Sequence, residues 1–297
     1  MGDVFEAIDR VTGAPVAVKV IQARRVHDSG DLRRFLVEAR AAAAVSHTGI
    51  VRTFDVDVTP DGTIFQVMEL LKGVTMAEWI ARPGLRPIGA VAAAGRVLAE
   101  ALAAAHAAGV VHRDIKPHNA MLILEAPGIK VLDFGISKVT SGAEDEVGLT
   151  KSRAILGTPA YMAPEQLVDS KFAGPASDVY SMGVVLYQAF TGKRPFDGGV
   201  ERLFASHTEQ PPPNVRAGRP DLPVGIADTI MSCLEKDAAA RPTALVVAEA
   251  LAPHADAASL EGEAKLSVSP RRDTIVETVS DEVKVPVDEV TGLTRAS

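Results

Sequence analysis

The sequence predicts an α+β fold of two lobes, a small β-rich N-lobe followed by a larger helical C-lobe. Strand-like runs separated by turn signals concentrate in the first seventy residues, whereas helical periodicity dominates from about residue 88 onward. The chain is 47% hydrophobic and 23% charged, which is typical of a globular protein and excludes wholesale disorder. Its 297 residues can bury a core without disulfides, and the single cysteine permits no internal disulfide.

The N-lobe prediction rests on turn sequences between strand-like runs. Thr-Gly-Ala-Pro at 12–15 predicts a hairpin, and Pro-Asp-Gly at 60–62 predicts a second one. Between the hairpins, Leu32, Leu36 and Ala39 recur at helical spacing. The predicted elements are therefore strands within 4–8, 16–20, 50–58 and 63–71 and a helix over 32–44.

The C-lobe is predicted to be mostly helical. The most apolar long stretch, 88–111, is interrupted by Arg96, Glu100 and His106, so it reads as an amphipathic helix of a soluble protein and not as a membrane span. Cys233 lies in an apolar helical stretch and is predicted to belong to the core. Further helices are expected near 176–191, 226–235 and 243–251.

The composition changes after about residue 254. Residues 255–297 contain nine acidic and five basic residues, no aromatic residue and only scattered apolar ones. Such a segment cannot bury enough surface to offset its ordering entropy, so we expect a mostly disordered acidic tail. The net charge of −7 argues against nucleic-acid binding through a basic surface. With no signal peptide visible, the expected location is cytoplasmic and no membrane partner is expected.

Four short motifs carry the chemical signal. Residues 112–119 read His-Arg-Asp-Ile-Lys-Pro-His-Asn, Asp-Phe-Gly stands at 133–135, Ala-Pro-Glu at 163–165 and Val-Ala-Val-Lys at 16–19. Each motif alone is weak, but four in the correct order and at plausible spacing are a strong signal. From Gly2 to about Leu251 the sequence resembles the eukaryotic-type protein kinase family. Its motif sequences look most like those of the bacterial serine/threonine branch of that family.

The resemblance implies ATP and Mg²⁺ as cofactors, with Mn²⁺ a possible substitute. Phosphoryl transfer requires positioning and charge neutralisation more than covalent chemistry. By resemblance, Lys19 holds the α- and β-phosphates and Glu38 is its acidic partner. Asn119 and Asp133 are the implied metal ligands, since magnesium prefers oxygen.

The resemblance also assigns the catalytic and adenine-binding groups. Asp114 matches the catalytic base that accepts the proton of the substrate hydroxyl, and Lys116 matches the lysine that contacts the transferring phosphate. Adenine needs a flat apolar slot with backbone hydrogen bonds at one edge. Any one of the slot residues could equally be plain core. By resemblance the slot has Val4 and Ala17 as roof, Met68 as gatekeeper, the backbones of Glu69 and Leu71 at its edge and Met121 as floor.

The acceptor is expected to be a serine or threonine of a protein substrate. Lys116 and Thr158 both match residues typical of the serine/threonine branch. Arg113 before the catalytic aspartate usually accompanies phosphorylation of the activation loop, for which Thr150 and Ser152 are the best-placed candidates. Kinases that phosphorylate their own loops often do so as transient homodimers.

Several residues are expected to be structural. The resemblance places His112 beside Phe134, and it has Asp178 anchor the catalytic loop from below. It also pairs Arg241 with Glu165. His106 and His118 show no partner pattern and are taken as ordinary polar residues.

The glycine-rich loop is only partly present. Gly2-Asp3-Val4 matches the end of the family's Gly-x-Gly-x-x-Gly-x-Val pattern, and the first two glycines and the preceding strand are absent. Either the recorded start is too late, or the chain is truncated and serves as a pseudokinase-like scaffold. Because Lys19, Asp114 and Asp133 remain, an active lineage is favoured. The predicted organisation is an N-lobe over 1–71, a C-lobe over 72–254 and the tail over 255–297.

The tail contains two segments that could be read by a partner protein. Residues 271–274 and 278–281 could become phosphothreonine sites for a partner with an arginine-lined pocket. A plain solvated tail is the simpler interpretation of the same composition.

Overall fold

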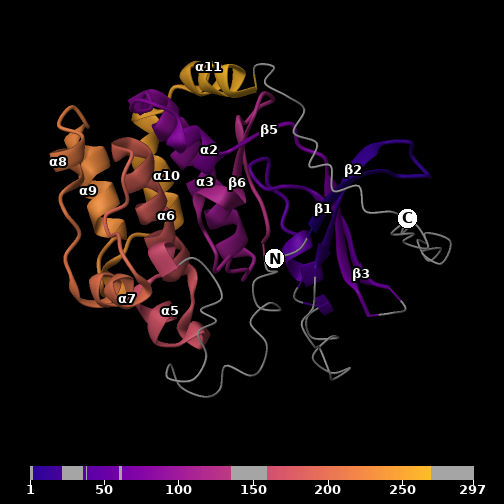
Figure 1. The fold of residues 1–297 in the computed structure, drawn as a ribbon, viewed down its shortest axis with the longest axis horizontal. Helices are drawn as coiled ribbons and strands as arrows, with labels where there is room; N and C mark the ends of the chain where they lie inside the picture. Colours follow the sequence, from indigo (N-terminus) through magenta and orange to yellow (C-terminus); the bar gives the residue numbers. More distant parts are fainter. Residues whose placement is uncertain (1–2, 22–35, 38, 60–61, 135–158, 269–297) are drawn as a thin grey trace.

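A computed structural model describes residues 3–21, 36–37, 39–59, 62–134 and 159–268. Two lobes are evident in Figure 1, with the strands of the first part of the chain on one side and the helices of the second part on the other. This arrangement confirms the predicted α+β fold with a β-rich N-lobe and a helical C-lobe.

The N-lobe is built on an antiparallel sheet in the order β1-β2-β4-β3. Both predicted hairpins form, the first around a turn in which Gly13 has φ 71° and donates its N–H to the Asp9 carbonyl at 2.8 Å. Glycine tolerates this left-handed conformation without steric cost. The four strands are β1 (Asp3–Ile8), β2 (Pro15–Ile21), β3 (Thr53–Val58) and β4 (Ile64–Glu69).

Part of the predicted helix over 32–44 is described. Residues 36–37 and 39–43 are helical, and Ala39 packs with Val56 and Ile64 in a small buried cluster against the sheet. Glu38 lies outside the described residues.

The connection between the lobes runs from β4 into β5 (Gly73–Thr75), which pairs with β6 (Ala120–Ile123). β6 in turn pairs with β7 (Ile129–Val131). A Cβ atom on Gly73 would lie 1.8 Å from the Leu122 carbonyl oxygen, so only glycine permits this close approach. The lobes are also joined through Val51, whose N–H donates to the Val131 carbonyl at 2.9 Å.

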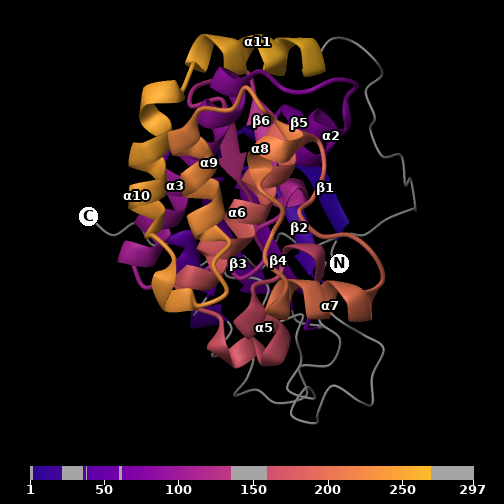
Figure 2. The same ribbon diagram turned by 90° about the vertical axis from the view of Figure 1, so that its left-hand side faces the viewer.

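The C-lobe is organised around α3 (Ile88–Ala107). Among the described residues it is the one helix long and apolar enough to cross a membrane, but 67% of its apolar window is buried inside the lobe. Figure 2 shows α3 with other helices of the lobe around it. Those helices are α2 (Met76–Ala81), α5 (Pro164–Val168), α6 (Pro175–Thr191), α7 (Val200–Glu209), α8 (Val215–Gly218), α9 (Val224–Cys233), α10 (Ala244–Leu251) and α11 (Ala257–Val268).

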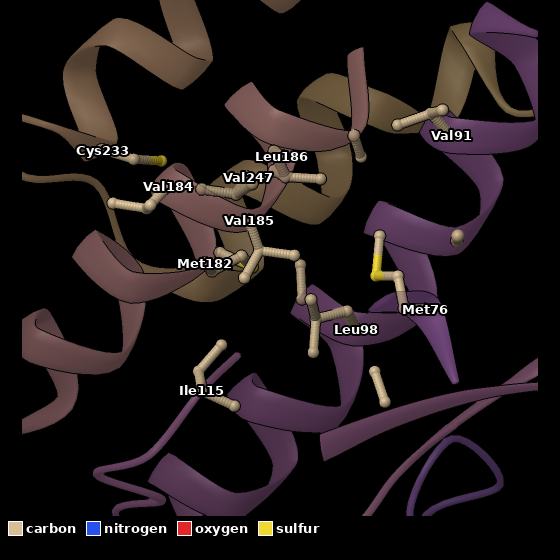
Figure 3. Close-up of a cluster of buried hydrophobic side chains, with 14 of the residues drawn as sticks. Met76, Val91, Leu98, Ile115, Met182, Val184, Val185, Leu186, Cys233 and Val247 are labelled. Atoms are coloured by element: carbon tan, nitrogen blue, oxygen red, sulfur yellow. The ribbon is translucent and has the colours of Figure 1, made fainter. Parts of the chain in front are cut away.

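The C-lobe core lies between α3, α6 and α10. Figure 3 shows Leu98, Met182, Leu186 and Val247 converging from these helices, and each is fully or almost fully buried. Cys233 is also buried there, as predicted, and burial raises the pKa of its thiol to about 12. At neutral pH this cysteine is therefore a protonated core residue and not a nucleophile.

The prediction of a disordered tail from residue 255 is wrong for its first part. α11 packs across α3 and β5, with Leu260 and Ala264 fully buried against the lobe (Figure 2). Its Glu263 carboxylate accepts hydrogen bonds from Trp79 Nε1 at 2.7 Å and Arg86 Nη1 at 3.2 Å. Leu260, Ala264 and Glu263 hold this helix on the lobe, and the composition of the segment alone did not reveal these contacts. Residues 269–297 lie outside the described residues.

The contact between α11 and Trp79 can be measured directly, because Trp79 is the only tryptophan in the chain. We expect Glu263→Gln to lower the free energy of unfolding by about 2 kcal/mol, since Arg86 is 6% exposed and loses its charged partner. Trp79 fluorescence should shift at the same time. Glu261→Gln is the matched control, because Glu261 is exposed and its one ion-pair partner in the described part of the chain is Lys265 on the same helix. Equal effects of the two variants would contradict the contact.

Candidate active site

One face of the N-lobe sheet gathers four of the ten predicted nucleotide-binding residues. Cross-strand pairing sets Val4 opposite Lys19 and Ala17 opposite Met68. Since directly opposed residues and residues two apart on a strand share a face, these four side chains lie on the same side of the sheet. The sheet register therefore brings the proposed roof, gatekeeper and phosphate-binding lysine together.

Lys19 is held at the boundary between the lobes by an ion pair. Its Nζ lies 2.6 Å from Asp133 Oδ1, and the two side chains are 15% and 26% exposed. Asp133 follows β7 and has φ 62°, a left-handed conformation that is uncommon for a residue other than glycine. In this strained backbone conformation, the Asp133 carboxylate of the C-lobe lies against Lys19 of the N-lobe. Such outliers concentrate at functional sites.

Asp114 lies at the centre of a second group of polar side chains. Its Oδ2 atom accepts a hydrogen bond from Lys116 Nζ at 2.7 Å and another from Asn119 Nδ2 at 3.0 Å. Asn119 Nδ2 also donates to the Asp114 carbonyl at 2.8 Å, which fixes the loop between them. These contacts orient the carboxylate and leave its Oδ1 atom without a hydrogen bond among the described residues.

The two groups are joined through the backbone. The Leu132 N–H donates to the Asn119 carbonyl at 2.8 Å, so the residue before Asp133 is tied to the 3-10 turn η1 (Pro117–Asn119). Lys19, Asp133, Asn119 and Asp114 consequently form one continuous arrangement across the two lobes.

The catalytic loop is anchored by the buried carboxylate of Asp178 at the start of α6. It accepts hydrogen bonds from the backbone N–H of His112 at 2.8 Å and of Arg113 at 2.7 Å, as predicted. His106 Nε2 lies 2.9 Å from the same carboxylate, so His106, taken from the sequence as an ordinary polar residue without a partner pattern, is a neighbour of this anchor. Arg113 has φ 68°, a second left-handed residue that this anchor sustains.

His112 packs beside Phe134, as the resemblance implied. Their ring centroids are 4.6 Å apart in an edge-to-face arrangement, and His112 Nε2 is hydrogen-bonded to the Leu132 carbonyl at 2.8 Å. His112 is fully buried, so it shapes the site without reaching a substrate.

A cluster of apolar side chains lies at the sheet face. Ala17 and Met68 form a buried cluster with Val51, against which Leu71 and Leu132 pack. Leu132 was not among the sequence candidates, although its place directly before Asp133 was a usable signal.

The remaining slot candidates differ in how they are placed. The Glu69 N–H donates to the Arg52 carbonyl at 2.9 Å, so only the Glu69 carbonyl can serve a base. The Leu71 backbone makes no backbone hydrogen bond within the described part of the chain. Met121 lies half-buried on β6 opposite Thr75, and Val4 is 59% exposed.

The oxygen donors fit a magnesium ion that is also held by phosphates. Asn119 donates its side-chain nitrogen to Asp114, which leaves its side-chain oxygen Oδ1 without a hydrogen bond among the described residues, and Asp133 places its Oδ1 atom 2.6 Å from Lys19 Nζ. In that part of the chain, no three acidic, histidine or cysteine side chains gather into a metal site of their own. Magnesium commonly takes only one or two protein carboxylates together with waters and substrate phosphates.

Downstream of the site, Glu165 at the start of α5 pairs with Arg241 as predicted. The two Arg241 terminal nitrogens lie 2.8 and 2.9 Å from the two Glu165 oxygens. Burial pushes the pKa of Glu165 upward, but hydrogen bonds from Arg241 and Ser177 outweigh it and the net pKa is lowered. Gln166 Nε2 in the same helix donates to the Arg113 carbonyl at 3.0 Å, so α5 is fixed beside the catalytic loop.

The sequence is similar to known protein kinases along most of its length. The protein kinase domain family model matches residues 1–253. Serine/threonine-protein kinase PknA of Mycobacterium tuberculosis is 39% identical over 246 residues, which cover 81% of this chain and 55% of that protein. Serine/threonine-protein kinase pkn3 of Myxococcus xanthus is 36% identical over 279 residues, which cover 92% of this chain and 50% of that protein. The chain thus spans about half the length of these relatives.

Solved structures share the same fold. The kinase domain of Mycobacterium tuberculosis PknI superposes with a TM-score of 0.67 at 26% identity, covering 86% of this chain and 92% of that one. Rad53 residues 1–466 in complex with AMP-PNP gives a TM-score of 0.66 at 26% identity, covering 83% of this chain and 60% of that one.

Proposed function

Because the chain belongs to the protein kinase family, we propose that it transfers the γ-phosphate of ATP to serine and threonine hydroxyls of protein substrates. The observation that carries the proposal is the continuous arrangement of Lys19, Asp133, Asn119 and Asp114 across the two lobes. Phosphoryl transfer depends on charge neutralisation and in-line positioning, and these are the groups that supply both.

In the proposed mechanism each residue acts on a defined group. Asp114 accepts the hydroxyl proton of the acceptor through its carboxylate, which Asn119 and Lys116 orient. Lys116, which donates to the same carboxylate, would share its charge with the transferring phosphate. Lys19 holds the non-transferred phosphates.

The metal proposed for Asn119 and Asp133 is Mg²⁺, with Mn²⁺ a possible substitute. A bound divalent ion would neutralise the charge of the phosphates. The support is the choice of donors, one amide oxygen and one carboxylate, both on the C-lobe side of the Lys19 ion pair.

The acceptor class is tested with three peptides that differ only in having serine, threonine or tyrosine at one position. We expect phosphate on the serine and threonine peptides and none on the tyrosine peptide. ATP binding without transfer to any of the three would favour the scaffold alternative instead. A cytoplasmic location, where ATP is available, is part of the proposal.

Phosphorylation of the activation loop is proposed as the switch. The loop candidates Thr150 and Ser152 lie outside the described residues, but Arg113 is described, and its Nε atom is buried without a hydrogen-bond partner there. A phosphate brings roughly −1.5 to −2 charges and would satisfy such a guanidinium.

We therefore expect incubation with ATP to place phosphate on Thr150 or Ser152 and to raise kcat toward a peptide substrate. Mass spectrometry of the chain before and after incubation checks this. Normal substrate phosphorylation with both residues unmodified would rule the switch out, and Thr140→Ala serves as the matched loop control.

Two further partners are proposed, a second copy of this chain and a phosphothreonine-reading protein. A transient homodimer would allow one copy to phosphorylate the loop of another, and a phosphothreonine-reading protein would bind residues 271–274 or 278–281. Both tail segments lie outside the described residues. Because α11 packs on the C-lobe, the docking test must delete 269–297 only and not the whole of 255–297. If the deleted chain recovers the phosphothreonine-reading partner as well as the full chain does, the docking proposal is contradicted.

A further inference from the structure

An ion pair joins the two lobes beside the expected adenine slot. Lys130 on β7 of the C-lobe donates from its Nζ atom to Oε1 of Glu69, the last residue of β4 in the N-lobe. The two side chains are 15% and 27% exposed, so solvent screens this pair less than it screens a surface ion pair. None of the roles assigned above uses either side chain.

The same Glu69 oxygen accepts a hydrogen bond that would ordinarily belong to the sheet ladder. Arg52 lies opposite Glu69, in the register that continues from the pairing of Thr53 with its partner on β4. In a regular antiparallel pair of this kind, the two residues exchange both N–H···O=C bonds. The Glu69 N–H does donate to the Arg52 carbonyl at 2.9 Å, but the Arg52 N–H donates to the Glu69 carboxylate at 2.7 Å. The carboxylate thus takes the place that the Glu69 carbonyl would have in a regular ladder.

The Glu69 carbonyl is thereby left out of the exchange with Arg52 at the point where a base would bind. Met68, the residue before it, belongs to the buried apolar cluster, and Leu71 packs against the same cluster. Since the Glu69 N–H is engaged, the backbone of this residue presents an acceptor and no donor. Such an edge favours a base with an exocyclic amino group over one with an oxygen in that place, because two facing acceptors leave each other unsatisfied.

Lys130 reaches Glu69 from a strand that is fixed to both lobes. Strand pairing sets Lys130 directly opposite Met121 on β6, the expected floor of the slot. The next residue, Val131, donates its N–H to the Gly49 carbonyl at 2.8 Å and accepts from the Val51 N–H at 2.9 Å. The ammonium group therefore has a defined origin, and its charge holds the Glu69 carboxylate in place beside the Arg52 N–H.

We propose that Lys130 is a positioning residue for the nucleotide base: it holds the Glu69 carboxylate on the Arg52 N–H and so leaves the Glu69 carbonyl available to select a base with an exocyclic amino group. The inference rests on the proposed use of ATP and adds the residue that fixes the base-selecting edge. The role concerns the base, and not the peptide or the transferred phosphate.

Nucleotide binding measures this role without catalysis. Inosine triphosphate carries an oxygen in place of the amino group of ATP, and calorimetry with the full chain and Mg²⁺ gives Kd for both nucleotides. Lys130→Met removes the charge and keeps the length of the side chain. We expect the ratio of Kd for inosine triphosphate to Kd for ATP to fall about tenfold in this variant, the loss of one hydrogen bond. Lys265→Met is the matched control, because the Lys265 side chain is 64% exposed and pairs with Glu261 on α11.

Two replacements of Glu69 test the other half of the pair. Glu69→Leu removes the side-chain acceptor, so the Arg52 N–H should return to the backbone carbonyl at position 69 and the preference for ATP should fall by a similar factor. Glu69→Gln keeps a side-chain oxygen that can accept from both Arg52 and Lys130, and it should retain most of the preference. Thermal unfolding of each variant confirms that the proteins compared are folded.

An unchanged preference in Lys130→Met and Glu69→Leu would overturn the proposal. Equal weakening of the binding of both nucleotides would also overturn it, because a merely structural role would not distinguish the two bases. A wild type that binds both nucleotides equally would contradict it as well. The kinase function fails separately: ATP binding with the expected preference, but without transfer to any peptide, would refute that function and support the role of Lys130.

Discussion

Replacing Asp114 with asparagine should reduce kcat by about 10²–10⁴-fold, the range typical for loss of a general base. Asparagine keeps an oxygen that can accept from Lys116 and thus preserves the geometry around Asn119, but it cannot take up the hydroxyl proton. KM for ATP should change little, because Asp114 does not contact the nucleotide-binding face of the N-lobe. Steady-state kinetics with a serine peptide measure both quantities.

Asp197→Asn is the matched control for this substitution. Asp197 is 67% exposed, pairs with Arg194 three residues before it and has none of the catalytic roles assigned above, so its variant should keep full activity. Thermal unfolding should be unchanged for both variants. An Asp114→Asn protein with near-normal kcat would show that another group accepts the proton.

Replacing Arg241 with leucine should have the largest effect on stability. The Arg241 side chain is 0% exposed and uses its three nitrogens to donate to Glu165 and to the carbonyls of Glu235, Ala176 and Lys236. Its loss leaves the Glu165 carboxylate, whose side chain is 18% exposed, with Ser177 as its remaining side-chain partner among the described residues, at a cost of about 4 kcal/mol in the free energy of unfolding. Urea unfolding of the C-lobe measures the difference.

The control for Arg241 is Arg194→Leu, which breaks an ion pair with a mostly exposed partner and should cost less than about 1 kcal/mol. The pH dependence gives a second check. Because the pKa of Glu165 is lowered in the folded state, its contribution is present above its usual pKa of 4.5 and is lost as pH falls below that value. That acid dependence should shrink in Arg241→Leu. Similar costs for the two leucine variants would contradict the anchoring role.

The parts of the fold that local sequence determines could be predicted. Thr12 to Pro15 specify a turn by their own backbone preferences, and the alternating residues beside them specify its strands. The active-site residues were identified because several motifs occur in one order. Their order revealed Lys19, Asp114 and Asp133, although no single one of these residues carries a distinctive pattern.

Contacts between distant segments could not be predicted in the same way. His106 contacts Asp178, which lies seventy-two residues later in the chain, and the sequence around neither residue indicates that the two will meet. The second failure is α11, which buries the apolar side chains of Leu260 and Ala264 against the lobe and whose Glu263 depends on Trp79 and Arg86 for its partners. A short helix that is stabilised by packing and not by its own propensity has no strong sequence pattern.

The account's central claim is that this arrangement transfers phosphate from ATP to a hydroxyl. The most direct test follows one reaction containing the chain, Mg²⁺, γ-labelled ATP and a serine peptide, and measures ADP and phosphopeptide together. The account predicts that each ADP formed is matched by one phosphate on the peptide serine and that Asp114→Asn abolishes both signals. ADP formation without phosphopeptide, or phosphopeptide at an unchanged rate in Asp114→Asn, would contradict it.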